Sequence, residues 1–132
     1  LAQELHGNET ILLVENDDEV RGLMFGILAS LGYTVLEARH GREALRVSEN
    51  HVGPIHLLLT DIVMPEMGGR ELAVRLSVLR PDIKTVFMSG FIDNADVQDL
   101  LADSDILFLQ KPFPPDILAE RLRRALETDG GA

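Results

Sequence analysis

The sequence predicts an α/β fold, a doubly wound sandwich of three layers with a parallel sheet in the middle. Five short apolar runs alternate with five helix-like stretches along the 132 residues. Three of these runs, at 11–14, 57–59 and 86–88, are continuously apolar, which is typical of strands covered on both faces. Strict alternation with short connections favours right-handed crossovers, which place helices on both sides of the sheet.

We expect strands over 10–14, 33–38, 55–60, 84–88 and 106–110. The clearest helix follows the first strand, where Asp17 or Asp18 can cap its start and Gly32 can end it. Its apolar stripe has helical spacing and consists of Val20, Leu23, Met24, Ile27, Leu28 and Leu31.

The last helix covers 117–126 and follows Pro114-Pro115-Asp116, a favourable start for a helix. Its stripe consists of Leu118, Leu122, Ala125 and Leu126. Weaker helical patterns cover 42–50, 69–79 and 94–102. One domain over 10–127 is therefore expected, between a polar linker-like lead at 1–9 and a tail at 128–132. Because the chain starts at Leu1 and not at Met, we expect it to be a piece of a longer polypeptide.

Composition narrows the classes of function. The chain has 22 acidic and 12 basic residues and a formal net charge of −10, which disfavours direct contact with nucleic acid. It has no cysteine, so disulfide scaffolds and thiolate chemistry are excluded. Its apolar runs stop far short of the ~20 residues of a membrane span. We therefore expect a cytoplasmic domain that does not insert into membranes, although its parent protein could be membrane-anchored.

Polar side chains follow four of the predicted strands. Glu15 and Asn16 follow the first, Asp61 the third, Ser89 the fourth and Lys111 the fifth. In a parallel α/β sheet these ends share one edge, where ligands bind. Clustered acidic oxygens suit a hard cation such as Mg²⁺. An Asp beside it can attack phosphorus, and a lysine and a hydroxyl can hold the phosphoryl oxygens.

The polar residues after the strands, including Asp17 and Asp18 beside Asn16, also have simpler structural interpretations. Asp17 and Asp18 are expected to cap a helix, Ser89 before Gly90 suits a turn, and Lys111 suits a solvated loop. The functional hypothesis depends on the occurrence of all of them, in order, at consecutive strand ends.

Four segments resemble the receiver domain of two-component response regulators, over about 10–126. They are ILLVEND at 11–17, LTDIVMP at 59–65, MSG at 88–90 and FLQKPF at 108–113. The resemblance implies a flavodoxin-like (βα)5 fold with strand order 2-1-3-4-5. It also implies that Asp61 accepts a phosphoryl group from a phosphohistidine on a histidine kinase or a histidine phosphotransfer domain.

The same resemblance implies a site for Mg²⁺, or Mn²⁺, formed by Glu15, Asn16, Asp61 and the backbone carbonyl of Val63. Ser89 and Lys111 would bind phosphoryl oxygens.

Phosphorylation would then move Ser89 and turn Phe108 inward, which switches the face of the fourth helix, fifth strand and fifth helix. That face could also pair two copies of the chain. Such a domain catalyses its own aspartyl phosphorylation and dephosphorylation without turning over a separate substrate.

The chain departs from the family pattern at one metal-binding position. Asn16 stands where the family has an acidic metal ligand, and the loss of one charge should weaken Mg²⁺ binding. Asp17 could supply that charge if its loop reached inward. Val63 and Phe91 stand at the two positions that tune dephosphorylation in the family. Both are apolar and cannot orient an attacking water, so we expect slow self-dephosphorylation.

Two other functions remain open. The chain could be a pseudo-receiver, a docking module that works without phosphorylation, and Asn16 favours that reading. An aspartate-nucleophile phosphatase would need two Asp residues separated by one position, where this chain has Glu15 and Asp17. A dinucleotide-binding protein is disfavoured, because no glycine-rich loop follows the first strand. The motifs at 88–91 and 108–113 resemble those of receiver domains at the C-terminal end of hybrid sensor histidine kinases. We therefore expect the chain to be part of a hybrid sensor histidine kinase.

Overall fold

The computed structural model of the chain describes residues 5–127, which form five strands and five helices in strict alternation. The predicted tail at 128–132 and the first four residues of the predicted lead lie outside the described residues. In chain order the elements are β1 (Thr10–Val14), α1 (Asp18–Ser30), β2 (Thr34–Ala38), α2 (Gly41–Asn50), β3 (Leu57–Asp61), α3 (Gly69–Leu79), β4 (Lys84–Ser89), α4 (Ala95–Leu101), β5 (Leu107–Gln110) and α5 (Pro115–Glu127).

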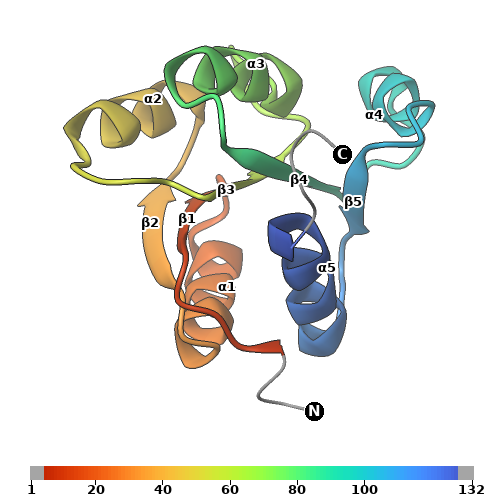
Figure 1. Cartoon of the computed structure of the whole chain (residues 1–132). Coiled ribbons are helices and arrows are strands. Elements are labelled where there is room, and N and C mark those ends of the chain that lie inside the picture. The colour runs from red at the N-terminus through yellow and green to blue at the C-terminus, as the bar shows by residue number, and fades with distance from the viewer. Residues whose placement is uncertain (1–4, 128–132) are drawn as a thin grey trace.

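The strands form one parallel sheet in the order β2-β1-β3-β4-β5. Helices α1 and α5 cover one face, and α2, α3 and α4 cover the other (Figure 1). The predicted fold class and strand order are therefore confirmed. The order reverses direction at β1 and β3, and this switch point places the carboxyl ends of β1 and β3 side by side.

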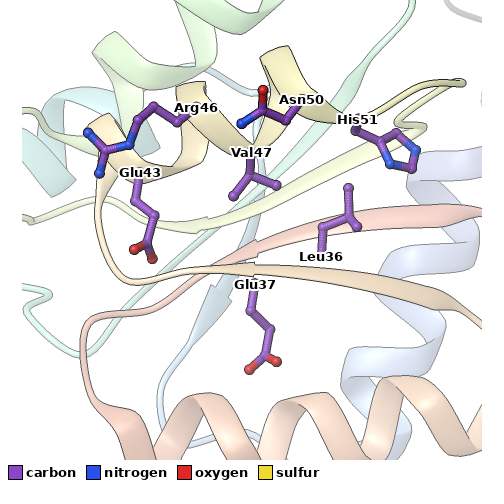
Figure 2. A pocket seen from close by; sticks show the side chains of 7 residues that line it. All are labelled: Leu36, Glu37, Glu43, Arg46, Val47, Asn50 and His51. Atoms are coloured by element: carbon purple, nitrogen blue, oxygen red, sulfur yellow. The ribbon is translucent and has the colours of Figure 1, made fainter.

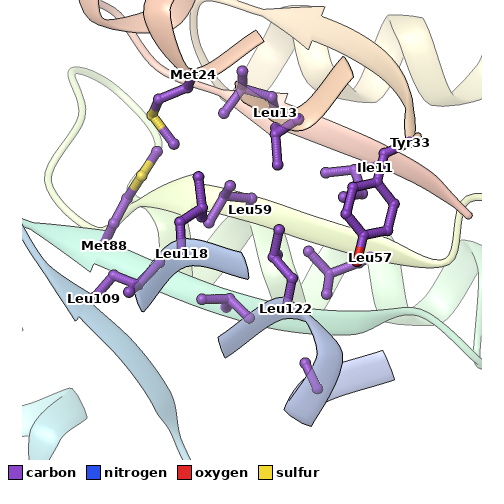
Figure 3. Close-up of a cluster of buried hydrophobic side chains, with 13 residues drawn as sticks. Ile11, Leu13, Met24, Tyr33, Leu57, Leu59, Met88, Leu109, Leu118 and Leu122 are labelled. Carbon is purple, nitrogen blue, oxygen red and sulfur yellow. The ribbon is translucent and has the colours of Figure 1, made fainter. Parts of the chain in front are cut away.

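The central strands are buried on both faces, as their continuous apolar runs predicted. Because successive side chains alternate between faces, Ile11 and Leu13 of β1 point toward α1 and α5, while Leu12 and Val14 point toward α2 and α3. Figure 3 shows the first of these clusters. Its labelled members are Ile11, Leu13, Met24, Tyr33, Leu57, Leu59, Met88, Leu109, Leu118 and Leu122.

Helix α1 begins where the sequence indicated, but its apolar stripe is narrower than predicted. The Asp17 carboxylate caps the helix by accepting from the backbone N–H of Glu19 at 2.9 Å and of Val20 at 3.1 Å. Met24 and Leu28 are buried, whereas Leu23 is 71% exposed. The prediction that Leu23 belongs to the buried stripe was wrong, because its side chain lies on the solvent-exposed face of α1.

The last residues of the polar lead contact the domain. Gly7 donates its backbone N–H to Leu31 O at 3.0 Å. The Glu9 carboxylate pairs with Arg123 of α5 at 2.8 Å, and Arg123 also donates to the Tyr33 hydroxyl at 3.3 Å. Gly32 has a φ of 102° and packs so close to the Gly7 oxygen that a Cβ would lie 2.3 Å from it. These contacts join residues 7–9 to α1 and α5.

Candidate functional site

A cleft of ≈ 330 Å³ lies at the carboxyl edge of the sheet. The segment after β1, the ends of β3 and β4 and the segment after β5 each contribute to it. Its lining includes all of the residues predicted for the phosphoryl and metal sites, namely Glu15, Asn16, Asp61, Val63, Ser89 and Lys111. Asp17, Val20, Pro65, Gly90 and Phe91 complete the lining.

Asp61 ends the buried strand β3 and is itself buried. Its Oδ1 lies 2.5 Å from the ammonium nitrogen of Lys111. The same ammonium donates to Oε1 of Glu15, which is also buried. One lysine therefore bridges two carboxylates that come from neighbouring strands and that would otherwise repel each other.

Burial raises the pKa of Asp61 to about 7, and the charge of Glu15 acts in the same direction, while Lys111 opposes both. For Lys111, burial alone would lower the pKa, but its hydrogen bonds to Asp61 and Glu15 outweigh burial and raise the pKa. Lys111 thus stays charged, and it favours the ionised form of Asp61 that a nucleophile requires.

The backbone behind Asp61 is held by close contacts. Ile62 N donates to Met88 O at 3.0 Å, and Gly69 N donates to Ile62 O at 2.8 Å. A Cβ at position 69 would lie 2.1 Å from the backbone oxygen of Asp61, so this approach of α3 requires glycine. Between them Glu66 has a φ of 67°, a left-handed conformation that turns the loop above the cleft.

The loop between β1 and α1 carries the other acidic residues. Glu15 Oε2 accepts from the backbone N–H of Asp17 at 2.9 Å. The Asn16 amide reaches toward Arg39 O, with a donor–acceptor distance of 3.5 Å. Asp17 caps α1, as the simpler interpretation predicted, so its carboxylate is engaged with the helix. The alternative in which Asp17 replaces the missing charge at Asn16 is not what the structure shows.

Ser89 and Phe108 occupy different surroundings. Ser89 is buried at the end of β4, where its hydroxyl accepts from Phe91 N at 2.9 Å. Phe108 is half-buried on β5 and packs against the cluster of Ile62, Phe87, Val97 and Leu100 beside α4, outside the lining of the cleft. The two residues predicted as a switch therefore lie on the neighbouring strands β4 and β5.

The donor set at the cleft fits a hard divalent cation. Two carboxylates, the Asn16 amide and the Val63 carbonyl group offer the oxygen ligands that Mg²⁺ prefers. Within residues 5–127 no three His, Cys, Asp or Glu side chains gather into a metal cluster. Glu15 and Asp61 are the acidic pair, and Lys111 neutralises part of their charge.

A second hollow, of ≈ 570 Å³, lies away from the strand ends, between β2 and α2. Figure 2 shows Leu36 and Val47 near its middle. Its polar lining consists of Glu37, Glu43, Arg46, Asn50 and His51, and it is separate from the cleft around Asp61.

Sequence reasoning missed two residues that shape the site. Arg21 of α1 donates to the backbone oxygen of Glu15 at 2.8 Å. Gly69, at the start of the helical pattern predicted over 69–79, allows α3 to touch the Asp61 backbone. A signal for Arg21 was present in the sequence. It is a basic residue one turn into the helix that follows the acidic residues at the end of the first strand. The contact of Gly69 has no local signal, because it forms across a loop.

The parallel order, the switch point and a buried aspartate beside a lysine define an α/β domain of the flavodoxin-like class with a polar site at the carboxyl edge of its sheet. The chain belongs to the response regulator receiver domain family, whose model matches residues 11–123. It is thus a receiver domain of two-component signalling. Receiver domains of this kind interact with histidine kinases or phosphotransfer proteins and generally bind Mg²⁺ for phosphorylation.

Two relatives come from Brucella abortus (strain 2308). The sensor kinase CckA is 43% identical over 126 residues, which cover 96% of this chain and 13% of that kinase. The response regulator receiver protein CpdR is 40% identical over 117 residues, which cover 88% of this chain and 95% of CpdR. The crystal structure of the receiver domain from the hybrid histidine kinase CckA matches with a TM-score of 0.75 and 34% identity, over 89% of this chain and 99% of that one. Within residues 5–127 no helix has the length and apolar character of a membrane span.

Proposed function

We propose that this receiver domain accepts a phosphoryl group on Asp61 and that a phosphohistidine of a histidine kinase or phosphotransfer domain donates it. The observation that carries the proposal is the placement of Asp61. Its carboxylate lies at the end of a buried strand, in an accessible cleft, 2.5 Å from a lysine ammonium. An aspartate so placed is available as a nucleophile and has a cation ready for the incoming charge.

In the proposed step an Oδ atom of Asp61 attacks phosphorus. The new O–P bond forms as the P–N bond of the phosphohistidine breaks, and the bonding electron pair leaves with the imidazole nitrogen. Lys111 lies where it can hold a phosphoryl oxygen, and the Ser89 hydroxyl can do the same once it releases Phe91 N. A divalent cation held by Glu15, Asn16, Asp61 and the Val63 carbonyl group would supply electrostatic stabilisation of the charge on the phosphoryl group.

The proposed output is a change on the face formed by α4, β5 and α5. Ser89 would move toward the phosphoryl group, and Phe108, packed beside α4, would turn inward. Because the Phe108 carbonyl accepts from Arg121 of α5 at 3.2 Å, a movement of β5 would reach α5 directly. Pairing of two copies through this face, and an origin in a hybrid sensor kinase, belong to the same proposal.

The test is the intact mass of the protein after incubation with acetyl phosphate, with and without Mg²⁺. We expect a Mg²⁺-dependent gain of one phosphoryl group that Asp61→Asn abolishes. Asp17→Asn is the matched control, because it removes a carboxylate from the same cleft while asparagine can still cap α1. A gain that persists in Asp61→Asn would contradict the proposal.

We also expect the phosphorylated domain to lose its phosphoryl group slowly. Val63 is 37% exposed and Phe91 is 64% exposed, and both line the cleft with apolar groups that cannot orient a water molecule. Replacing both by polar residues, Val63→Asn with Phe91→Glu, should therefore accelerate hydrolysis about tenfold or more, since a positioned general base or hydrogen-bonding group typically contributes at least that much. The rate is measured as loss of the phosphoryl mass after the donor is removed, and an unchanged rate would contradict the prediction.

A docking module that works without phosphorylation is the second candidate. Asn16 is the feature that favours it, because it removes one acidic ligand from the cleft, whereas the presence of Asp61, Ser89 and Lys111 favours phosphorylation. A folded protein that gains no phosphoryl group even at high Mg²⁺ would favour this function.

A further inference from the structure

We propose that Arg21 is a positioning residue for the cation site, which it serves by holding the loop of Glu15 and Asn16 between α1 and β2. This inference rests on the proposed phosphoacceptor function and deepens it. Arg21 lies in the first part of α1 and does not line the cleft, so it would act through the loop and not through the cation or the phosphoryl group.

The central contact is a hydrogen bond to the loop backbone. Nη1 of Arg21 donates to the backbone oxygen of Glu15 at 2.8 Å, and the Arg21 side chain is only 15% exposed. A charged donor on a largely buried carbonyl group is stronger than a neutral one and is costly to lose.

The guanidinium is held by two further contacts. Nη2 lies 2.7 Å from Oδ1 of Asp18, at the start of α1, and Nε lies 3.4 Å from Oε1 of Glu37 on β2. Figure 2 shows the Glu37 carboxylate directed from β2 toward α1. Arg21 thus joins the edge strand β2, the start of α1 and the loop that carries Glu15. The planar guanidinium group suits this role because it has several N–H donors in fixed directions.

The bond to Glu15 orients the peptide group from which Asn16 extends. The hydrogen bond that the Asn16 side chain donates to Arg39 O is long, at 3.5 Å. Rotation of the Glu15–Asn16 peptide would therefore redirect the Asn16 amide, and it would also disturb the Glu15 carboxylate, which is tied to Asp17 N at 2.9 Å. Because Asn16 brings no charge, the site depends more on the placement of its oxygens.

Arg21 also balances the local charge. Asp17, Asp18, Glu19 and Glu37 lie around the loop on α1 and β2. Without the guanidinium these carboxylates would repel Glu15 and one another, and the loop would be expected to open. The side chain thereby supports the geometry of the acidic site while leaving the negative charge of Glu15 to face the cleft.

The test compares Arg21→Met and Arg21→Lys with Arg75→Met, a control that removes the exposed ion pair of Arg75 with Glu71 on α3. Mg²⁺ is titrated while amide chemical shifts are followed, and phosphoryl gain from acetyl phosphate is measured across the same concentrations. We expect the Mg²⁺ Kd of Arg21→Met to rise about tenfold, as for other residues that support metal ligands, with an intermediate rise for Arg21→Lys. The half-saturating Mg²⁺ concentration should rise in parallel, with little change in rate at saturation.

An Arg21→Met protein that binds Mg²⁺ as tightly as the parent would overturn the inference, while a phosphoryl gain in the parent would leave the proposed function standing. A general loss of folding is distinguished by Arg21→Lys, which keeps the charge but carries its donors on a single nitrogen atom. If Arg21→Lys is folded and its Kd equals that of the parent, the inference is also overturned. A parent that neither binds Mg²⁺ nor gains a phosphoryl group contradicts both the inference and the proposed function.

Discussion

Replacing Lys111 with methionine is expected to lower the free energy of unfolding by about 1–3 kcal/mol at pH 8. The change leaves the buried carboxylates of Glu15 and Asp61 side by side without the cation that bridges them. Loss of one partner from a fully buried pair costs about 3–5 kcal/mol, and we reduce that value because the Lys111 side chain is 24% exposed. Phosphoryl uptake should fall about a hundredfold, as when one preorganised donor is removed from a charged transition state.

The stability loss should depend on pH in a defined direction. The pKa of Asp61 in the folded protein is raised to about 7, mainly by burial, and removal of Lys111 would raise this pKa further. Because this pKa lies above the ordinary value of 3.8, the stability that the protonated carboxyl contributes is fully present below about pH 3.8 and is lost as the pH rises to about 7, and a still higher pKa in Lys111→Met extends the loss above pH 7. The deficit of Lys111→Met should therefore shrink between pH 8 and pH 5.

Urea unfolding at pH 8 and at pH 5 measures this difference. Arg75→Met is the control, because it removes one cation from an exposed ion pair with Glu71 on α3, away from the residues that line the cleft. Its effect should vary little between the two pH values. A Lys111→Met deficit that is equal at both would show that Asp61 and Glu15 do not depend on this lysine.

Gly69→Ala is expected to destabilise the domain by about 2 kcal/mol and to slow phosphoryl uptake. The added Cβ would lie 2.1 Å from the backbone oxygen of Asp61, so α3 and β3 must separate. Overpacking of a close contact typically costs about 1–3 kcal/mol. A displacement of about 1 Å at a reacting group can cost about a hundredfold in rate, so uptake should be affected more than by the loss of stability alone.

Gly22→Ala is the matched control for this change. Gly22 lies in α1, and a Cβ there would meet no described atom within 4 Å. The same substitution should therefore stabilise the protein by about 0.5–1 kcal/mol, because alanine favours helix and glycine does not. Urea unfolding and the rate of mass gain are measured for both variants. Equal stability changes in the two would contradict the proposed contact of α3 with the Asp61 backbone.

Much of the fold follows from local pattern. The bounds of the strands agree with the apolar runs to within two residues, because strands covered on both faces need continuous apolar side chains. The largest difference is at β3, which begins at Leu57 and not at residue 55. There the His56 imidazole accepts from Thr10 N at 2.9 Å, so a side chain replaces a strand hydrogen bond. The replacement of a backbone hydrogen bond by a side chain leaves no mark on the spacing of apolar residues, so the sequence pattern could not predict it.

The exposure of Leu23 shows a second limit. Helical spacing indicates a stripe about the helix axis, but the width of the stripe that becomes buried depends on how the helix lies against the sheet. Met24 and Leu28 face the sheet, and Leu23 does not. The packing angle is a property of the whole fold, so the sequence pattern overestimated the buried face.

The sequence by itself determined the alternating α/β architecture and the set of polar residues at the strand ends, because hydrophobic periodicity and turn residues act over short distances. It also determined that Asp61 and Lys111 share one edge, since parallel strands end on the same side. Only the tertiary structure decided that Lys111 bridges Glu15 and Asp61, that Gly69 touches the Asp61 backbone, and that Arg21 holds the Glu15 carbonyl group. These contacts join separate elements, and their distances are set by how helices and loops pack on the finished sheet.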